Sequence, residues 1–124
     1  MKNQRVILRK NKDKAIRNRH HWIFSGAVKS FPPGFENGSI LPVESSEGEH
    51  LGYAYFNKQC SIVGRMVSFD QTHPLEAIKK NIEDAILLRK QFFDKRTNAY
   101  RLINGEGDNL PGLVVDRYSD VRVI

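Results

Sequence analysis

The densest group of side chains that could take part in chemistry lies in residues 100–118, which read YRLINGEGDNLPGLVVDRY. Acids and arginines are mixed there with glycine and proline, and apolar runs at 102–103 and 113–115 flank the turn formers. This pattern predicts a strand, a tight polar loop and a second strand. Loops held between strands often carry function, so the stretch is a candidate active site, although an ordinary solvated turn has the same composition.

The glycines of this loop do not form a nucleotide-binding fingerprint. Gly105 and Gly107 are followed by Leu110 where a third glycine would stand, and the chain then runs into Pro111 rather than into a helix. The spacing of the acids is also wrong for a calcium loop, and no helices flank it. We therefore expect neither a dinucleotide nor a metal ion to bind here.

A second group of functional candidates lies in the basic N-terminal quarter. Residues 1–30 hold nine Lys or Arg against one acid, Asp13, whereas residues 31–124 hold eleven against thirteen acids. A concentrated basic patch fits a polyanion, which could be a nucleic acid or an acidic membrane face. The alternative is a solvated surface that keeps the protein soluble.

His20, His21 and Trp22 follow the basic segment 10–19, for which we expect a short exposed helix along a phosphate backbone. Trp22 could be a core or hinge anchor, or a platform on which a base stacks. The two histidines could contact phosphate, but adjacent residues of an extended segment point to opposite sides and no third metal ligand is suitably spaced. The predicted metal content is therefore none.

Cys60 is the only cysteine, so no internal disulfide can form and a reducing, cytoplasmic location is expected. A buried structural thiol is the role we expect for it. No apolar run reaches the roughly 20 residues of a membrane-spanning helix, and the basic N-terminus lacks the apolar segment of a signal peptide. We expect no membrane association.

The elements that position these groups change type along the chain. Residues 5–8 form a short apolar run. Three apolar runs at 39–44, 51–56 and 61–69, separated by short turns, predict a small antiparallel sheet or barrel, with Gly52 and Gly64 marking bulges. From Pro74 the apolar spacing becomes three to four residues, which predicts an amphipathic helix of about twenty residues with Lys95 and Arg96 in its last turn. A second, α+β unit thus begins near Pro74.

The last residues, 121–124, alternate as a strand up to an apolar final side chain. Natural termini are usually polar and frayed. The sequence therefore reads as part of a longer protein, and we expect residues 119–124 to be frayed or paired with a neighbouring chain.

Three stretches resemble one family. HHWIFSGAV at 20–28, NKQCSIVGR at 57–65 and above all residues 100–118 are similar to the bacterial class I S-adenosylmethionine-dependent methyltransferases that modify cytosine C5 in 23S ribosomal RNA. The third stretch is the most specific, because Arg101, Glu106 and Asp108 fit the family pattern together with most of their neighbours. Asn109, His21, Lys58 and Cys60 depart from that pattern.

The resemblance implies a fold and a division of labour. It implies a mainly β, PUA-like pseudo-barrel that binds RNA at 1–71, followed at 72–124 by the start of a small, truncated α+β domain. The S-adenosylmethionine-binding catalytic domain would be absent, so the segment would be inactive alone and hold no catalytic residue. Ribosomal RNA would be the partner, and a homodimer of the full-length protein is one assembly that the family allows.

The resemblance and the residue pattern together assign two sets of site residues. The expected RNA-binding residues are Lys14, Arg17, Arg19, His20, His21, Trp22 and Arg65. The second set forms a wall that faces the target base or a brace against the catalytic domain: Arg101, Glu106, Asp108 and Asp116. For the acids of the second set the alternative is purely structural, with the carboxylates accepting backbone N–H bonds and pairing with Arg101 or Arg117.

Two other functions remain open. The chain could be a stand-alone RNA-binding PUA module without catalytic activity, or a basic domain that binds an anionic membrane or a protein partner. A stand-alone module would have a stop codon after Ile124, whereas a methyltransferase gene would continue into a catalytic domain. A domain that binds a membrane or a protein would bind RNA without a steep fall in affinity as salt is added.

Overall fold

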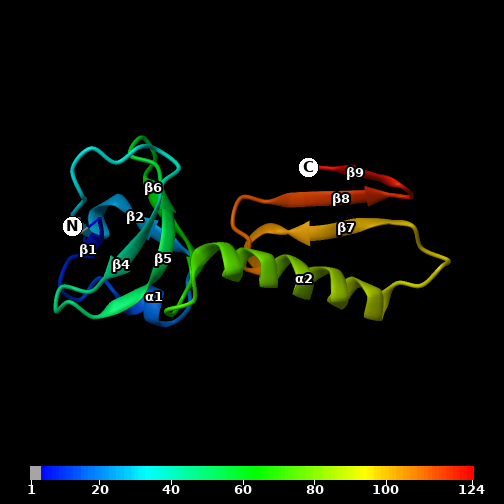
Figure 1. The fold of residues 1–124 in the computed structure, drawn as a ribbon, viewed down its shortest axis with the longest axis horizontal. Coiled ribbons are helices and arrows are strands. Elements are labelled where there is room, and N and C mark those ends of the chain that lie inside the picture. The colour runs from blue at the N-terminus through cyan, green and yellow to red at the C-terminus, as the bar shows by residue number, and fades with distance from the viewer. Residues whose placement is uncertain (1–3) are drawn as a thin grey trace. The chain divides into compact units, whose positions relative to one another are not determined.

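The computed structural model describes residues 4–124, so Lys2 of the basic quarter lies outside the described residues. The chain divides into two compact units, Met1–Pro74 and Leu75–Ile124. The first contains a six-stranded sheet and the second a helix with a three-stranded sheet (Figure 1). Mainly β structure followed by an α+β unit is the predicted fold class, which is confirmed.

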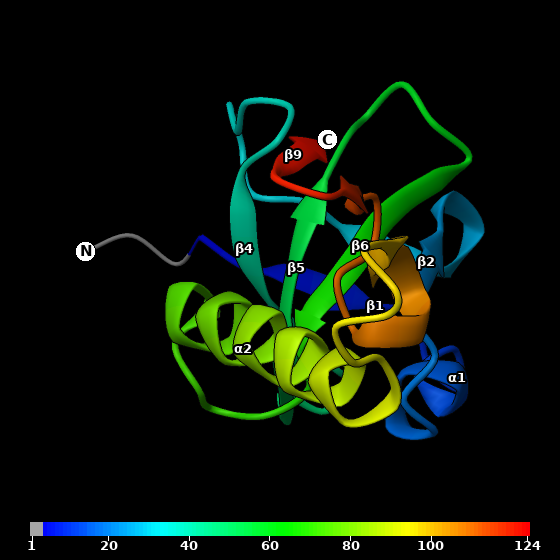
Figure 2. The ribbon, with the colours of Figure 1, turned by 90° about the vertical axis from the view of Figure 1, so that its right-hand side faces the viewer.

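The first unit is built from short strands in a curled sheet. Its elements are β1 (Val6–Leu8), α1 (Lys14–Arg17), β2 (Trp22–Phe24), the 3₁₀ turn η1 (Ser25–Ala27), β3 (Val28–Ser30), β4 (Ile40–Glu44), β5 (His50–Phe56) and β6 (Ile62–Ser68). The strand order is β2-β6-β5-β4-β1-β3, antiparallel except between β1 and β4. Only η1 separates β2 from β3 in sequence, yet they stand at the two ends of this order. The sheet must therefore curl, as in a pseudo-barrel (Figure 2).

Alternation along the strands decides which side chains enter the core of this unit. In β2 only Ile23 is buried, whereas Trp22 is half-buried and Phe24 is 51% exposed. Phe56 is fully buried, and a Cβ built on Gly64 would come within 2.5 Å of its ring. The missing side chain of Gly64 thus makes room for Phe56.

Trp22 is not one of the buried core residues, so the prediction that Trp22 is a core anchor was wrong.

The two strand glycines lie beside irregularities in pairing, as predicted. The register shifts between Val43 and Glu44, opposite Gly52, and between Ile23 and Phe24, opposite Gly64. Gly52 has φ +144° and its Cβ would lie 2.1 Å from the carbonyl oxygen of Ser68. No other residue fits so close a backbone approach, and bulges of this kind increase strand bending.

The second unit packs one helix on a small antiparallel sheet. Its elements are α2 (Pro74–Phe92), β7 (Ala99–Asn104), the 3₁₀ turn η2 (Gly105–Asp108), β8 (Val114–Tyr118) and β9 (Val121–Val123), with strand order β7-β8-β9. Ala85 of α2 is buried against Ile103, Leu110 and Val115. Burial of each such aliphatic side chain contributes roughly 1.5–3 kcal/mol, which explains why the helix repeats apolar residues on one face.

The end of α2 and the last strand differ in detail from the sequence prediction. The helix ends at Phe92, before Lys95 and Arg96, because the Asp94 carboxylate accepts the backbone N–H of Arg96 at 2.9 Å and turns the chain. Residues Val121–Val123 form the predicted strand, but they pair with β8 within the chain. The expected fraying of this segment is therefore not found.

Candidate nucleic-acid interface

The outer face of the first sheet carries a row of side chains from four adjacent strands. Trp22 pairs with Arg65, Arg65 with Tyr55, and Tyr55 with Ile40. Residues that pair directly in antiparallel strands point to the same face, with Cβ atoms about 5 Å apart. Their neighbours Ile23, Gly64 and Phe56 point into the core, so the row, here called the Trp22 row, lies outside. All four members are half-buried.

One end of the Trp22 row is extended by aromatic rings and the other side opens into a pocket. The Trp22 ring makes edge-on contacts with His20 at 6.0 Å and with Phe24 at 6.4 Å between centroids. Tyr55 and Arg65 line a surface pocket of about 220 Å³ together with Asn57, Cys60, Ile62 and Val63. An arginine between two rings can bind phosphate while the rings stack on bases.

The two histidines diverge, as their extended backbone predicts. His20 Nδ1 accepts the backbone N–H of Trp22 at 3.3 Å, whereas His21 makes an edge-on contact with Phe69. The guanidinium of Arg19 lies over the same Phe69 ring, 5.5 Å from its centroid. Five of the seven predicted RNA-binding residues therefore fall into two groups, with His20, Trp22 and Arg65 in one and Arg19 and His21 in the other.

Arg17 is held by carboxylates of its own unit. Its Nε donates to Asp13 at 2.6 Å, and its two terminal nitrogens donate to Glu49 at 2.9 and 3.0 Å. Hydrogen bonds from Arg17 lower the pKa of both carboxyl groups, and the same bonds raise the pKa of Arg17. Lys14, on the same short helix, is exposed. Arg17 thus ties α1 to the turn between β4 and β5, and much of its charge is compensated.

Three further cations come together that were not among the predicted site residues. Arg9, Lys10 and Lys29 line one surface depression with Ser46 and Glu47. The Arg9 backbone N–H donates to the carbonyl of Ala27 at 2.8 Å, which brings the end of β1 next to β3. Pairing of distant strands creates this cluster, so no local pattern along the chain could reveal it.

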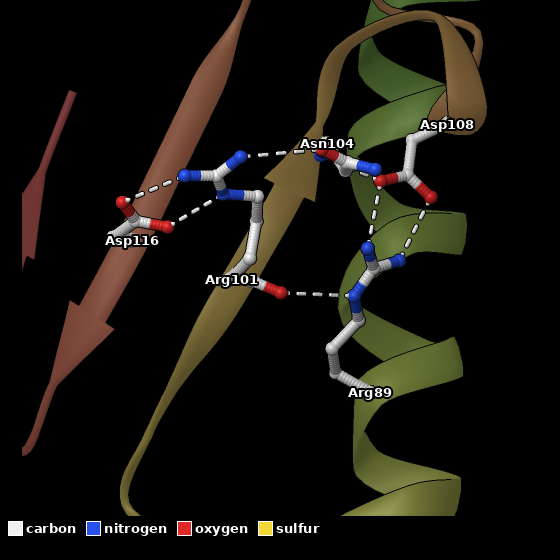
Figure 3. A network of polar contacts seen from close by, with 5 residues as sticks. All are labelled: Arg89, Arg101, Asn104, Asp108 and Asp116. Carbon is white, nitrogen blue, oxygen red and sulfur yellow. Dashed lines mark hydrogen bonds and ion pairs between the residues drawn. The ribbon is translucent and has the colours of Figure 1, made fainter.

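The loop between β7 and β8 is organised by an ion pair with the helix (Figure 3). Arg89 donates to both oxygens of Asp108 at 2.8 and 2.9 Å, and its Nε donates to the Arg101 carbonyl at 3.1 Å. Asp108 also accepts the backbone N–H of Asn104 at 2.7 Å. Burial raises the pKa of Asp108, but the bonds from Arg89 and Asn104 outweigh it and leave the pKa below its ordinary value.

A second pair joins the strands themselves. Arg101 of β7 donates to both oxygens of Asp116 of β8, at 2.8 and 3.3 Å, and these bonds lower the pKa of Asp116 (Figure 3). The geometry of Asp108 and Asp116 is thus the one that the structural alternative describes, with Arg89 as an additional partner. Glu106 lies with Asp108 in the 3₁₀ turn η2 and is half-buried.

The remaining candidates are the single cysteine and groups of metal-ligating side chains. Cys60 is exposed, so the expected buried thiol was wrong. Within residues 4–124, no group of three or more His, Cys, Asp or Glu side chains is arranged to hold a metal ion. None of the helices in this range is long and apolar enough to cross a membrane.

Sequence reasoning missed two residues that the geometry makes central. Tyr55 could have been found from the alternation in 53–56, where tyrosines occupy one face of the strand and Ala54 and Phe56 the other. Arg89 gave no local signal, because its partner Asp108 is 19 residues away and meets it only after the helix packs on the sheet.

Residues 6–69 match a family whose model is described as a PUA-like domain. This match covers more than half of the chain and all six strands of the first sheet.

The whole chain is similar to several curated proteins. It is 34% identical over 122 residues to a ribosomal RNA large subunit methyltransferase I from Alteromonas mediterranea, with 96% of this chain and 31% of that protein covered. A Vibrio cholerae protein of the same name is 35% identical over 121 residues, with coverage of 95% and 30%. The chain therefore spans about a third of the length of these relatives.

The chain is also similar to solved structures over most of its length. A candidate SAM-dependent methyltransferase from Streptococcus mutans superposes with a TM-score of 0.77 at 25% identity, covering 95% of this chain and 31% of that one. A candidate methyltransferase in complex with SAH superposes with a TM-score of 0.75, also at 25% identity, with the same coverage.

Proposed function

Because the chain belongs to the PUA-like domain family, we propose that it is the RNA-binding and scaffold portion of a ribosomal RNA methyltransferase that uses S-adenosylmethionine. The chain is homologous to ribosomal RNA large subunit methyltransferases over most of its length. This similarity, which runs through both compact units, is the observation that carries the proposal.

Within this proposal the two predicted domains have different tasks. Residues 1–71 bind ribosomal RNA through the basic surface and the Trp22 row, and residues 72–124 begin a central α+β domain that supports a catalytic domain. A dense phosphate surface and unpaired bases are what cations beside aromatic rings recognise. The coverage of about a third of each relative supports placing this segment in a longer enzyme. Its place at the N-terminal end of that enzyme rests on the family resemblance.

The cofactor does not fit the residues described here. Binding of the cofactor by a class I methyltransferase needs a glycine-rich turn that leads from a strand into the N-terminus of a helix. The loop after β7 is a four-residue 3₁₀ turn followed by β8, and Asp108 at its end is bonded to Arg89 and Asn104. We assign S-adenosylmethionine and the catalytic groups to the part of the relatives' length that this chain does not span.

The proposed reaction is methyl transfer to C5 of a cytosine in 23S ribosomal RNA. This choice rests on the resemblance of residues 100–118 to enzymes of that specificity. The same resemblance allows a homodimer of the full-length protein.

Deletion of the gene, followed by mass spectrometry of the 23S ribosomal RNA, tests the proposed function. We expect one 5-methylcytidine to disappear and to return when the intact gene is restored. Loss of a methyl group on another base would contradict the cytosine assignment alone. An unchanged methylation pattern, with RNA binding by the 124-residue chain retained, would instead support the alternative of a stand-alone PUA module.

A further inference from the structure

We propose that the Trp22 row is a docking site for single-stranded RNA, in which Trp22 and Tyr55 each stack on an unpaired base and Arg65 contacts the backbone between them. This inference rests on the proposed function, because it names the surface and the kind of RNA that the first unit recognises. Three properties of the row support it: the spacing of its rings, its anchoring from the core side and its charge.

The sheet fixes the spacing of the two rings. Trp22 and Tyr55 are both direct neighbours of Arg65, on the strands at either side of β6. Strands lie about 4.8 Å apart, so the two side chains leave the sheet about 10 Å from each other. At this distance each ring can receive its own base, and Arg65 lies between them where the linking phosphate would pass.

The core-facing residues hold the row rigidly. Ile23 and Gly64, next to Trp22 and Arg65 in sequence, pack with the fully buried Phe56, which itself follows Tyr55. The backbone of all three strands is thus anchored from below. A platform on strands loses little conformational freedom when a base stacks on it.

Charge identifies the occupant as a polyanion. Residues 1–74 hold eleven Lys or Arg against six acids, whereas residues 75–124 hold nine against eight. The described residues that line the pocket beside the row include Arg65 and no carboxylate. Phe24, in edge-on contact with Trp22, adds a third ring that is 51% exposed. Cations interleaved with exposed rings suit single-stranded nucleic acid, whose bases are free to stack.

Tyr118 of the second unit lacks this combination. Tyr118 is 54% exposed and pairs across the sheet with Val121 and Ala99 rather than with a cation. Arg122 is exposed and donates to the Ser119 carbonyl at 3.2 Å. Tyr118 and Arg122 therefore provide matched controls for Tyr55 and Arg65.

The test is fluorescence anisotropy of a labelled single-stranded RNA of about 12 nucleotides, and of a duplex of the same length, titrated with the 124-residue chain. We expect the single strand to bind more tightly than the duplex. Trp22→Leu and Tyr55→Leu should each weaken its binding by about tenfold, the loss of one base stack. Arg65→Gln should reduce the slope of log affinity against log salt by about one.

Control variants show whether a loss of RNA binding comes from a lost contact or from unfolding of the chain. Tyr118→Leu and Arg122→Gln should leave binding unchanged, and Trp22→Phe should restore most of the affinity lost in Trp22→Leu because it retains a ring. Circular dichroism of each variant checks that the sheet is intact. A variant of the row that unfolds is replaced in the comparison by Phe24→Leu, which removes an exposed ring and for which we expect a smaller loss.

The outcomes distinguish this inference from the function on which it rests. Wild-type chain that binds neither RNA would overturn both the proposed RNA-binding function and the docking site. Tight binding that is unaffected by the row variants would overturn only the docking site. Equal affinity for the duplex and the single strand would likewise overturn the stacking role.

Discussion

Arg89 and Arg101 of the second unit have different neighbours from Arg65 of the first unit. In the second unit Arg89 and Arg101 each donate two bonds to one carboxylate, and Asp108 is only 8% exposed at its side chain. In the first unit Arg65 lies on an outer sheet face between two aromatic rings. The first arrangement pairs each guanidinium with a carboxylate and holds a loop, and the second places a guanidinium beside rings that can stack on bases.

This difference shows that a conspicuous motif need not mark the functional surface. Residues 100–118 give the most specific resemblance, yet their acids Asp108 and Asp116 are engaged within the hairpin and its helix. The weaker stretches 20–28 and 57–65 supply Trp22 and Arg65, which meet only when β2 pairs with β6. Substitutions in the hairpin should therefore act on stability, and substitutions on the outer face of the first sheet should act on RNA binding.

Asp108→Asn should give the largest loss of stability. It leaves Arg89, only 14% exposed, facing a neutral group, and removal of one partner of such a buried pair costs about 3 kcal/mol. Chemical denaturation monitored by circular dichroism measures the change. Asp84→Asn is the control, because its pair with Lys80 is exposed on the same helix. Equal effects of the two substitutions would show that the Asp108 pair does not organise the hairpin.

Gly64→Ala should give the second largest loss of stability, because it forces a methyl group against the Phe56 ring in the first unit. Overpacking of this kind costs about 2 kcal/mol. Gly26→Ala is the matched control, since nothing lies within 4 Å of the Cβ position there. Unchanged stability of Gly64→Ala would mean that the core side of β6 does not anchor the Trp22 row.

The acid dependence of stability should report on the lowered pKa of Asp108. A carboxyl group whose pKa is lowered by folding stabilises the fold at pH values above its unfolded pKa, which is about 3.9. This contribution is lost as the pH falls through the lower pKa of the folded state. The stability difference between wild type and Asp108→Asn should therefore shrink below about pH 4. A difference that is constant from pH 7 to acid would contradict the charged pair.

Charge removal near α1 should have the smallest effect. Arg19→Gln should lower the salt slope of RNA binding by about one, whereas Arg17→Gln should lower it less, because Arg17 is already bonded to Asp13 and Glu49. Salt titrations of both variants with the same RNA measure the two slopes. A larger effect of Arg17→Gln would show that its ion pairs open to bind phosphate.

Periodicity and turn chemistry predicted most of the fold. The strands at 39–44, 51–56 and 61–69 and the helix from Pro74 were all found within a few residues, because alternation and three-to-four spacing are local signals. The role of Trp22 could not be fixed in this way, since its exposure depends on Ile23 turning inward against Phe56. The neutralisation of Arg17 by Glu49, 32 residues away, is likewise a product of the fold.

The central claim is that RNA stacks on the Trp22 row, and Trp22 tests it directly because it is the only tryptophan of the chain. Its fluorescence should be quenched as single-stranded RNA is added, saturate with the same affinity as anisotropy reports, and recover at high salt as the RNA dissociates. The Tyr55→Leu variant should need more RNA to reach the same quenching. Tight RNA binding with no change in Trp22 fluorescence would contradict the account.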